Sequence, residues 1–353
     1  MQIQEVDHVL SVLVFSTTNR CPIECPFCGA ECNPRNRDRL SLEFMTSVID
    51  QAQDLGSLEV VVFTGGEPLL LGQDLLAAVR YCADHGLKTR VVTNAYWARS
   101  DVAADRWLSR LVDAGLTEIN ISCDDYHQRE IPVENVRRAN DTARRMGLPC
   151  LVGHKEILGG SIHEESLSEL LGVPMERFRY GQVNPDNDVY LSSFNVPIAP
   201  QMHLIPDEEI LFPDSDDWKA PCTSVMENIV VTPQREVGIC CGMIPRSVRE
   251  VVVGSLDEAP LAQILFEADR DLIVNWLALE GPYGLMRFIQ ERAPEIRFRD
   301  RYVGPCHLCS EILTRPDCRA VLTRHAGEHA EALGVKRCVY DASRSEPVAV
   351  PAR

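Results

Sequence analysis

The chain has 353 residues, 45% of them hydrophobic, and a formal net charge of −17. This length suffices for one large domain with a substantial core and a smaller second one. The acidic balance argues against nucleic acid or an anionic membrane as a partner, because both need a basic face. Residues 1–20 lack the pattern of a signal peptide, and no apolar run approaches the roughly 20 residues of a membrane helix. We therefore expect a cytoplasmic protein.

Apolar runs alternate with helical patterns through the first half of the chain. Ser41 is placed to cap a helix over 42–55, and Gly86 to end one over 74–85. Further helical stretches lie around 101–114, 134–146 and 163–171, and the expected strands are 10–16, 58–63, 88–94, 118–124, 148–157 and 178–183. Apolar strands separated by helices indicate a parallel sheet with helices outside. The predicted fold is α/β, an open partial (β/α)6 barrel whose ligand site lies at the carboxyl ends of the strands.

The pattern changes after Pro185. Residues 186–220 are rich in Pro, Asp and Ser, which predicts a linker. Beyond it, 228–232 and 236–239 flank a turn and predict a hairpin, and helices are expected over 261–279 and 318–333. The expected organisation is a partial barrel in 1–190, a linker in 191–220, a smaller α+β domain in 221–340 and a disordered tail in 341–353.

The first of two cysteine sets lies directly after the first expected strand. Cys21, Cys25 and Cys28 stand in CPIECPFC with the spacing C-x3-C-x2-C. Three thiolates in one loop can ligate three irons of a four-iron, four-sulfur cluster and leave the fourth iron open. A structural zinc site is the alternative, and Cys32 could complete its ligand set. Clustered cysteines in an acidic chain without an export signal indicate metal ligands rather than disulfides.

Two motifs together resemble the radical S-adenosylmethionine (SAM) superfamily. CPIECPFC is similar to that family's cysteine signature, and Gly65-Gly66-Glu67-Pro68, which follows the second apolar strand, is similar to its second motif. The resemblance covers residues 10 to about 185. It implies a radical SAM enzyme in which a [4Fe-4S] cluster reductively cleaves SAM to a 5′-deoxyadenosyl radical, which then abstracts a substrate hydrogen. It also implies an electron donor such as flavodoxin or ferredoxin.

The resemblance also assigns roles to single residues. It implies that Cys21, Cys25 and Cys28 hold three irons while SAM chelates the fourth. Contacts to the SAM amino group, largely through the backbone, are implied for Gly65, Gly66 and Glu67.

The fourth strand supports a ligand-lined interior independently. In EINISCDD, Ser122 and Asp124 share one face while the apolar residues share the other. A parallel strand is usually apolar on both faces, so the polar face indicates a wet or ligand-lined site. The resemblance implies SAM contacts for these two residues and for Asn94, at the end of the third strand. Weaker candidates are Tyr96, Trp97, His127, Arg129, His154, Lys155, Gln182 and Asn184, and no catalytic base is assigned.

The second cysteine set lies in the smaller domain. Cys222 and Cys240 flank the predicted hairpin, and Cys306 and Cys309 form a C-x2-C pair. Such pairs can meet in a four-thiolate site. The arrangement is similar to the C-terminal twitch or SPASM extensions of radical SAM enzymes and implies one auxiliary [4Fe-4S] cluster. A structural zinc remains the alternative.

The remaining cysteines divide into three groups, of which Cys82, Cys123 and Cys150 lie in helix or strand patterns and are expected core residues. Cys241 and Cys318 are substitutes in the second ligand set, whereas Cys338 has no assigned role.

The substrate class stays open between two enzyme hypotheses. Radical SAM proteins with such extensions often modify peptides or proteins by crosslinking, epimerisation or oxidation, while others oxidise a small sugar or aminocyclitol. About ten residues precede the first strand, so no N-terminal leader-recognition domain is expected. The acidic linker over 186–220 could meet an extended basic chain, which favours a peptide substrate. The alternative to an enzyme is a non-catalytic scaffold that binds zinc.

Overall fold

The computed structural model describes residues 10–26, 28–156, 158–177, 188–194, 208, 210–240 and 248–345, with only the backbone of 188–194 and 342–345. One ten-stranded sheet runs through the molecule in the order β10-β9-β8-β1-β2-β3-β4-β5-β7-β6. Its first five strands in sequence are parallel to their neighbours along the sheet. They are β1 (Val12–Ser16), β2 (Val60–Thr64), β3 (Lys88–Thr93), β4 (Glu118–Ser122) and β5 (Cys150–Glu156).

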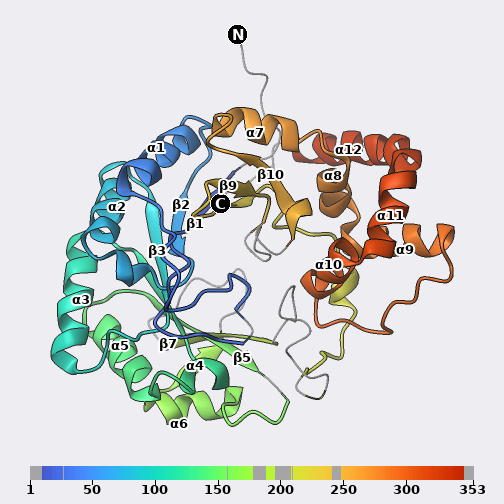
Figure 1. Ribbon diagram of the computed structural model, residues 1–353. Coiled ribbons are helices and arrows are strands. Elements are labelled where there is room, and N and C mark those ends of the chain that lie inside the picture. Colours follow the sequence, from blue (N-terminus) through green and yellow to red (C-terminus); the bar gives the residue numbers. More distant parts are fainter. Residues whose placement is uncertain are drawn as a thin grey trace, which may run out of the picture.

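Helices connect these strands and form an arc outside the sheet (Figure 1). The helix α1 (Leu42–Gln53) begins where predicted, because the Ser41 side chain accepts a hydrogen bond from the Phe44 N–H. The others are α2 (Gln73–Asp84), α3 (Asp101–Asp113), α4 (Asp125–Gln128), α5 (Val133–Arg145) and α6 (Leu167–Leu171). The carboxyl ends of the parallel strands therefore share one edge, which is where the predicted site residues lie.

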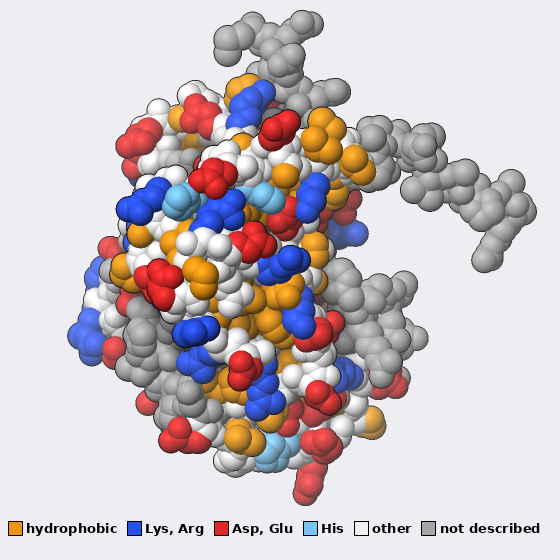
Figure 2. Space-filling view, turned by 90° about the vertical axis from the view of Figure 1, so that its right-hand side faces the viewer, with side chains coloured by type: hydrophobic (Ala, Val, Ile, Leu, Met, Phe, Trp, Pro, Cys, Tyr) orange, Lys and Arg blue, Asp and Glu red, His pale blue; other side chains and the backbone are white. Residues whose placement is uncertain are grey.

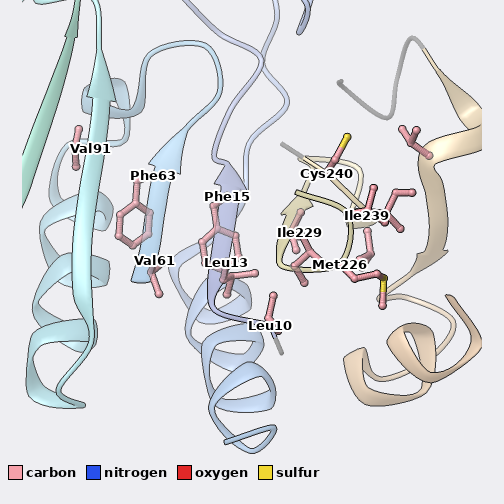
Figure 3. Close-up of a cluster of buried hydrophobic side chains, with 14 of the residues drawn as sticks. Leu10, Leu13, Phe15, Val61, Phe63, Val91, Met226, Ile229, Ile239 and Cys240 are labelled. Atoms are coloured by element: carbon pink, nitrogen blue, oxygen red, sulfur yellow. The ribbon is translucent and has the colours of Figure 1, made fainter. Parts of the chain in front are cut away.

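The core fills the space between the sheet and the helices. Alternate strand residues such as Leu13, Phe15 and Phe63 are fully buried, and the two phenylalanine rings stack with centroids 5.9 Å apart (Figure 3). The opposite face of the same strands carries a smaller buried cluster of Val14, Val62 and Val230. Because both faces of the central strands are buried, the apolar runs of the sequence are continuous rather than alternating.

The C-terminal region continues the same sheet. The predicted hairpin is present as β8 (Asn228–Val231) and β9 (Glu236–Gly238), and β10 (Val252–Ser255) adds to it antiparallel. Strand β8 lies parallel to β1, with Leu13 opposite Ile229. Side chains of the hairpin and of the first strands thus lie side by side in one core (Figure 3). This pairing of distant segments was not predicted.

Several expected boundaries differ from the structure. A strand, β7 (Asp188–Phe194), lies where the linker was expected to begin, and it pairs with β5 and with β6 (Met175–Arg177). The expected strand over 178–183 falls outside the described residues. The helix expected over 261–279 is two helices, α7 (Leu261–Ala268) and α8 (Leu272–Leu279). It is interrupted because the Asp271 carboxylate accepts from the N–H groups of Ile273 and Val274 and caps the second helix.

The remaining helices pack at the end of the chain. The helix expected over 318–333 is instead α11 (Pro316–His325) followed by α12 (Ala330–Ser345), so the prediction of a disordered tail is wrong for residues 341–345. Asp341 accepts from Arg337 at 2.8 Å, one turn earlier in α12. Two further helices, α9 (Gly281–Arg292) and α10 (Pro305–Thr314), were not predicted. On the face of the molecule that Figure 2 shows, positive and negative side chains are interspersed.

The predicted fold class is confirmed. The sheet is mostly parallel with helices outside, and among the described residues its end strands β10 and β6 do not pair with each other, so the sheet is open. Across the same described part of the chain, no helix combines the length and apolar character needed to cross a bilayer.

Candidate active site

A cavity of about 390 Å³ lies at the carboxyl ends of β2 to β5, beside the loop that follows β1. Of the nine residues predicted for the first site, eight line it, and only Glu67 does not. The lining residues from that prediction are Cys21, Cys25, Cys28, Gly65, Gly66, Asn94, Ser122 and Asp124. Residues from five separate stretches of sequence therefore meet in one cavity.

The three thiols of the cysteine loop differ in their surroundings. Burial raises the pKa of Cys21 to about 12 and also raises that of Cys25. The pKa of Cys28 is lowered to about 6, first because the Cys32 side chain hydrogen-bonds to it and further because backbone N–H groups of the loop point at its sulfur. A metal binds the thiolate form, so iron would displace protons from Cys21 and Cys25. The soft sulfur donors and their place in one loop fit an iron–sulfur cluster.

Gly65 and Gly66 bring the second motif against the cysteine loop. The Gly66 N–H donates to the Thr18 carbonyl at 2.6 Å, and the Glu67 N–H donates to the Arg20 carbonyl at 2.9 Å. A Cβ at Gly66 would lie 2.1 Å from the Arg20 oxygen, and Gly65 has a φ of 116°. No side chain fits this close approach. The glycines thus position the cysteine loop as well as bordering the cavity.

Glu67 lies beneath the cavity instead of in its wall. Its side chain is fully buried and accepts hydrogen bonds from the Leu69 N–H at 3.1 Å, the Thr93 hydroxyl at 2.9 Å and the Asn94 N–H at 3.0 Å. Burial raises the pKa of this carboxyl to about 7. Glu67 therefore ties the end of β3 to the second motif.

Charged residues border the far side of the cavity. Asp124 caps α4 by accepting from the N–H groups of Tyr126 and His127, and it pairs with the His127 ring at 2.9 Å. Burial alone would raise the pKa of Asp124, but the neighbouring His127 and Lys155 outweigh it and lower the pKa. The pKa of Lys155 is lowered, chiefly by burial. Lys155 was ranked among the weaker candidates, although its position two residues after Gly153 on β5 places both on the cavity face.

Most of the other weaker candidates have structural roles. Trp97 is buried and donates to the Thr93 hydroxyl at 3.0 Å, and the Arg129 guanidinium lies over the Tyr126 ring at 4.9 Å. His154 lines the cavity and its Nδ1 lies 2.8 Å from the Cys123 carbonyl oxygen. Tyr96 borders a neighbouring hollow of about 560 Å³ on the outer side of the cysteine loop. Residues 182 and 184 are outside the described residues.

The second cysteine set also comes together. Cys309, on α10, is buried, and the pKa of its thiol is raised by burial and then by the nearby thiols of Cys240, Cys306 and Cys222. Cys240 is likewise buried, at the end of the hairpin. Within the described residues, no group of three or more His, Cys, Asp or Glu side chains is placed to hold a single metal ion. The cluster assignment and its zinc alternative both stay predictions.

The substitute cysteines lie elsewhere. Cys318 is buried on α11, where its pKa is raised by burial and its N–H donates to the Asp317 carboxylate at 2.9 Å. Cys338 is exposed on α12, Cys32 lines the first cavity, and Cys241 is outside the described residues.

A small apolar cluster joins the surroundings of the two cysteine sets. Tyr126, Ile210 and Val303 are buried together, and Cys25 and Phe212 pack against them. Phe212 stacks on the ring of His307, with centroids 6.3 Å apart. Because His307 lies on α10 between Cys306 and Cys309, segments 210–212 and 303–309 reach from one cysteine set to the other.

Comparison with known proteins gives the same assignment. The model of the radical SAM superfamily matches residues 15–171. The PqqA peptide cyclase of Bradyrhizobium diazoefficiens is 37% identical over 117 residues, 32% of this chain and 28% of that protein. The PqqA peptide cyclase of Granulibacter bethesdensis is 29% identical over 135 residues, 37% of this chain and 32% of that protein. The chain thus matches less than a third of the length of these relatives.

A solved structure supports the fold over a longer stretch. The structure titled native anSMEcpe with bound AdoMet and Cp18Cys peptide is 12% identical to this chain, with a TM-score of 0.53. The match covers 93% of this chain and 99% of that one. At this identity the likeness shows the fold alone. The fold class predicted from the sequence is confirmed, and residues 15–171, somewhat less than half of the chain, match the radical SAM superfamily that the two motifs resemble.

Proposed function

We propose that the chain binds a [4Fe-4S] cluster on Cys21, Cys25 and Cys28, binds SAM beside it, and modifies a peptide or protein substrate by hydrogen abstraction. When bound together, the reduced cluster and SAM supply methionine and a 5′-deoxyadenosyl radical, which removes hydrogen from unactivated C–H bonds. The observation that carries this proposal is the single cavity in which the three thiols, the glycine pair and the polar strand ends meet.

The remaining lining residues suit the polar parts of SAM. The Lys155 ammonium is a compact charge that can pair with the carboxylate of the methionine moiety. Ser122 and Asp124 offer oxygen atoms to the ribose hydroxyls, and Asp124 is held in place by its bonds to the start of α4.

The apolar cluster beside Cys25 is proposed to keep water away from this side of the cysteine loop. Tyr126, Ile210 and Val303 are each at most 7% exposed, and they come from α4 and from two segments of the C-terminal region. A radical must meet its target before it meets water or another side chain. The C-terminal region therefore contributes apolar cover beside the cysteine loop.

Two observations support a peptide as the substrate. The named relatives are cyclases of a peptide, although they match this chain over a limited length. The segment that begins with Ile210 and Phe212, which belong to the apolar cluster beside Cys25, continues into exposed Asp214, Asp216 and Asp217. Exposed acidic residues that follow this cluster along the chain can hold an extended basic peptide by charge complementarity.

The second cysteine set is proposed to hold an auxiliary [4Fe-4S] cluster. Its ligands would be Cys222, Cys240, Cys306 and Cys309, which lie near one another and supply four soft donors. Four protein ligands leave no open iron, so this cluster would pass electrons rather than bind substrate. A carrier such as flavodoxin or ferredoxin is the proposed electron source.

An anaerobic assay tests the first part of the proposal. The purified chain is reconstituted with iron and sulfide, reduced with dithionite, given SAM, and assayed for 5′-deoxyadenosine. We expect product from the wild type, none from Cys25→Ala, and wild-type product from Cys82→Ala, a buried core cysteine of α2. A protein that holds only zinc and yields no product would contradict the proposal.

Mass spectrometry tests the substrate class. Short peptides encoded beside the gene are incubated with the reconstituted enzyme and SAM, and a mass change of one of them is expected. Oxidation of a sugar or aminocyclitol, with every peptide unchanged, would replace the peptide proposal by the small-molecule one.

A further inference from the structure

Asn94 makes a contact that its predicted role as a SAM ligand does not explain. Its side chain is 5% exposed, at the end of β3, and its Nδ2 donates to the Cys21 sulfur at 3.4 Å. This distance is ordinary for a hydrogen bond to sulfur, whose radius exceeds that of oxygen. The amide thus points at one of the three proposed cluster ligands.

The orientation of this amide follows from its other partner. The Asn94 Oδ1 accepts from the backbone N–H of Tyr96 at 3.0 Å, and a backbone N–H can only donate. The oxygen must therefore face Tyr96, which leaves the NH₂ group facing the sulfur. Turning the amide over would place two donors together and leave the Tyr96 N–H without this acceptor.

Buried neighbours hold Asn94 in this position. Its own N–H donates to the Glu67 carboxylate at 3.0 Å, and Glu67 is in turn fixed by the Leu69 N–H and the Thr93 hydroxyl. Thr93 also accepts from the Trp97 indole. The second motif is thereby linked to the cysteine loop in two ways. Gly66 bonds to it directly, and Glu67 is linked to it through Asn94 at the end of β3.

We propose that the Asn94 amide hydrogen-bonds the Cys21 sulfur of the bound cluster and raises the cluster's reduction potential. Reduction adds one negative charge to the cluster, and a donor to a cluster sulfur stabilises the more negative state more strongly. Asn94 is thus a positioning residue that acts through Cys21. This inference rests on the proposed function, because it needs the cluster on the first cysteine set.

The test is a potentiometric titration followed by electron paramagnetic resonance. Full-length wild type, Asn94→Leu and Asn94→Ala are reconstituted with iron and sulfide, and the first cluster is recognised as the one whose signal changes when SAM is added. Leucine fills the volume of asparagine without a donor, whereas alanine leaves room for a water that could donate. We expect a more negative midpoint potential in Asn94→Leu and a smaller shift in Asn94→Ala, with iron content unchanged.

A matched control lies on the neighbouring strand. Asn120 is on the polar face of β4, directly opposite Val92 of β3, and does not line the cavity. The same replacement, Asn120→Leu, is expected to leave the midpoint potential unchanged. An equal shift in both variants would overturn the inference, since it would trace the effect to general polarity.

SAM affinity separates the two roles of Asn94. Variants that keep the wild-type potential but bind SAM more weakly would make Asn94 a SAM ligand and overturn the inference. A wild type that assembles no four-iron cluster would overturn this inference and the proposed function together, whereas a normal cluster with unshifted potentials overturns the inference alone.

A second measurement covers variants that fail to fold or to hold iron. Wild-type protein containing asparagine labelled with ¹⁵N at the side-chain amide is reduced and examined by electron–nuclear double resonance. We expect a ¹⁵N coupling to the reduced first cluster, and its absence would overturn the inference.

Discussion

The two cysteine sets of this chain lie in opposite surroundings. Cys21, Cys25 and Cys28 occupy an irregular loop and border a cavity with charged walls. Cys240 and Cys309 belong to the hydrophobic core, among the side chains of the hairpin and of α10. The first set has three members that line a cavity, and the second has a buried Cys309 with the other three cysteines near it.

This difference separates two kinds of cluster chemistry. A three-thiolate site with open space can bind a cofactor at the fourth iron, whereas a closed four-thiolate site can only pass electrons or support the fold. The two sets are nevertheless connected, because the cluster around Val303 and Ile210 contacts Cys25 while Phe212 stacks on His307. The two sets therefore differ in their local surroundings, although both belong to regions built on the same sheet.

The largest expected effect comes from removing one ligand of each set. With both clusters the wild type should hold roughly eight irons, and Cys25→Ala and Cys309→Ala should each hold about four. Only Cys25→Ala should abolish 5′-deoxyadenosine formation with dithionite as reductant, because the first set is the proposed SAM site. Iron analysis and the product assay check both. If Cys309→Ala held as much iron as the wild type, the second set would hold no cluster, and the contrast between the two sets would be lost.

The next effect concerns how the first set is held. Gly66→Ala places a Cβ against the Arg20 carbonyl, and relieving that clash is expected to cost about 3 kcal/mol of unfolding free energy and to displace the cysteine loop. Denaturant unfolding and iron content measure it. Gly334→Ala, at an open position of α12, is the control and should be neutral or slightly stabilising. Equal behaviour of the two variants would show that the glycine contact does not position the loop.

A smaller effect is expected at the charged wall of the first cavity. Lys155→Ala removes the ammonium proposed to meet the SAM carboxylate, and SAM affinity should fall about tenfold, the scale of one hydrogen bond to a charged group. Iron content should not change. Equilibrium dialysis with labelled SAM measures the affinity. If SAM affinity did not change, the role of Lys155 would be limited to lowering the pKa of Asp124.

The smallest effect lies in the C-terminal region and depends on pH. The Glu280 carboxylate accepts from the Trp276 indole and from His329, each at 3.0 Å, and from Lys336. Burial alone would raise its pKa, but the bonds from Lys336 and His329 outweigh burial and lower the pKa. A lowered carboxyl pKa stabilises the fold above the unfolded value of about 4.3, and this stability is lost as pH falls through the folded value.

Glu280→Gln should therefore reduce the unfolding free energy by about 1–2 kcal/mol at pH 7, and the difference from wild type should shrink below about pH 4. Thermal unfolding across this range measures it, with exposed Glu331→Gln of α12 as the control. The first cluster should be unaffected. If Glu280→Gln lost SAM cleavage, the C-terminal helices would control the first site, and the two cysteine sets would not be independent in the way the comparison implies.

The first half of the fold was predictable because local signals and packing agree there. Ser41 caps its helix, Gly86 follows the next one with a φ of 74°, and the five first strands lie within two residues of their predicted limits. The C-terminal helices were harder to predict. The break at Asp271 depends on one capping carboxylate inside a continuous apolar pattern. Helix α10 begins at Pro305, directly before the cysteine pair that was interpreted only as a set of metal ligands.

The sequence by itself determined the resemblance to the radical SAM superfamily, the α/β class and the cysteines proposed as ligands, because fixed spacings and strand periodicity are local properties of a chain. The tertiary structure alone decided what these residues touch. It paired β8 with β1, placed Glu67 beneath the cavity, turned the Asn94 amide toward Cys21 and brought Val303 against Cys25. Each of these contacts joins residues at least 27 positions apart, and the strand order and side-chain packing that create them follow from the burial of the whole core.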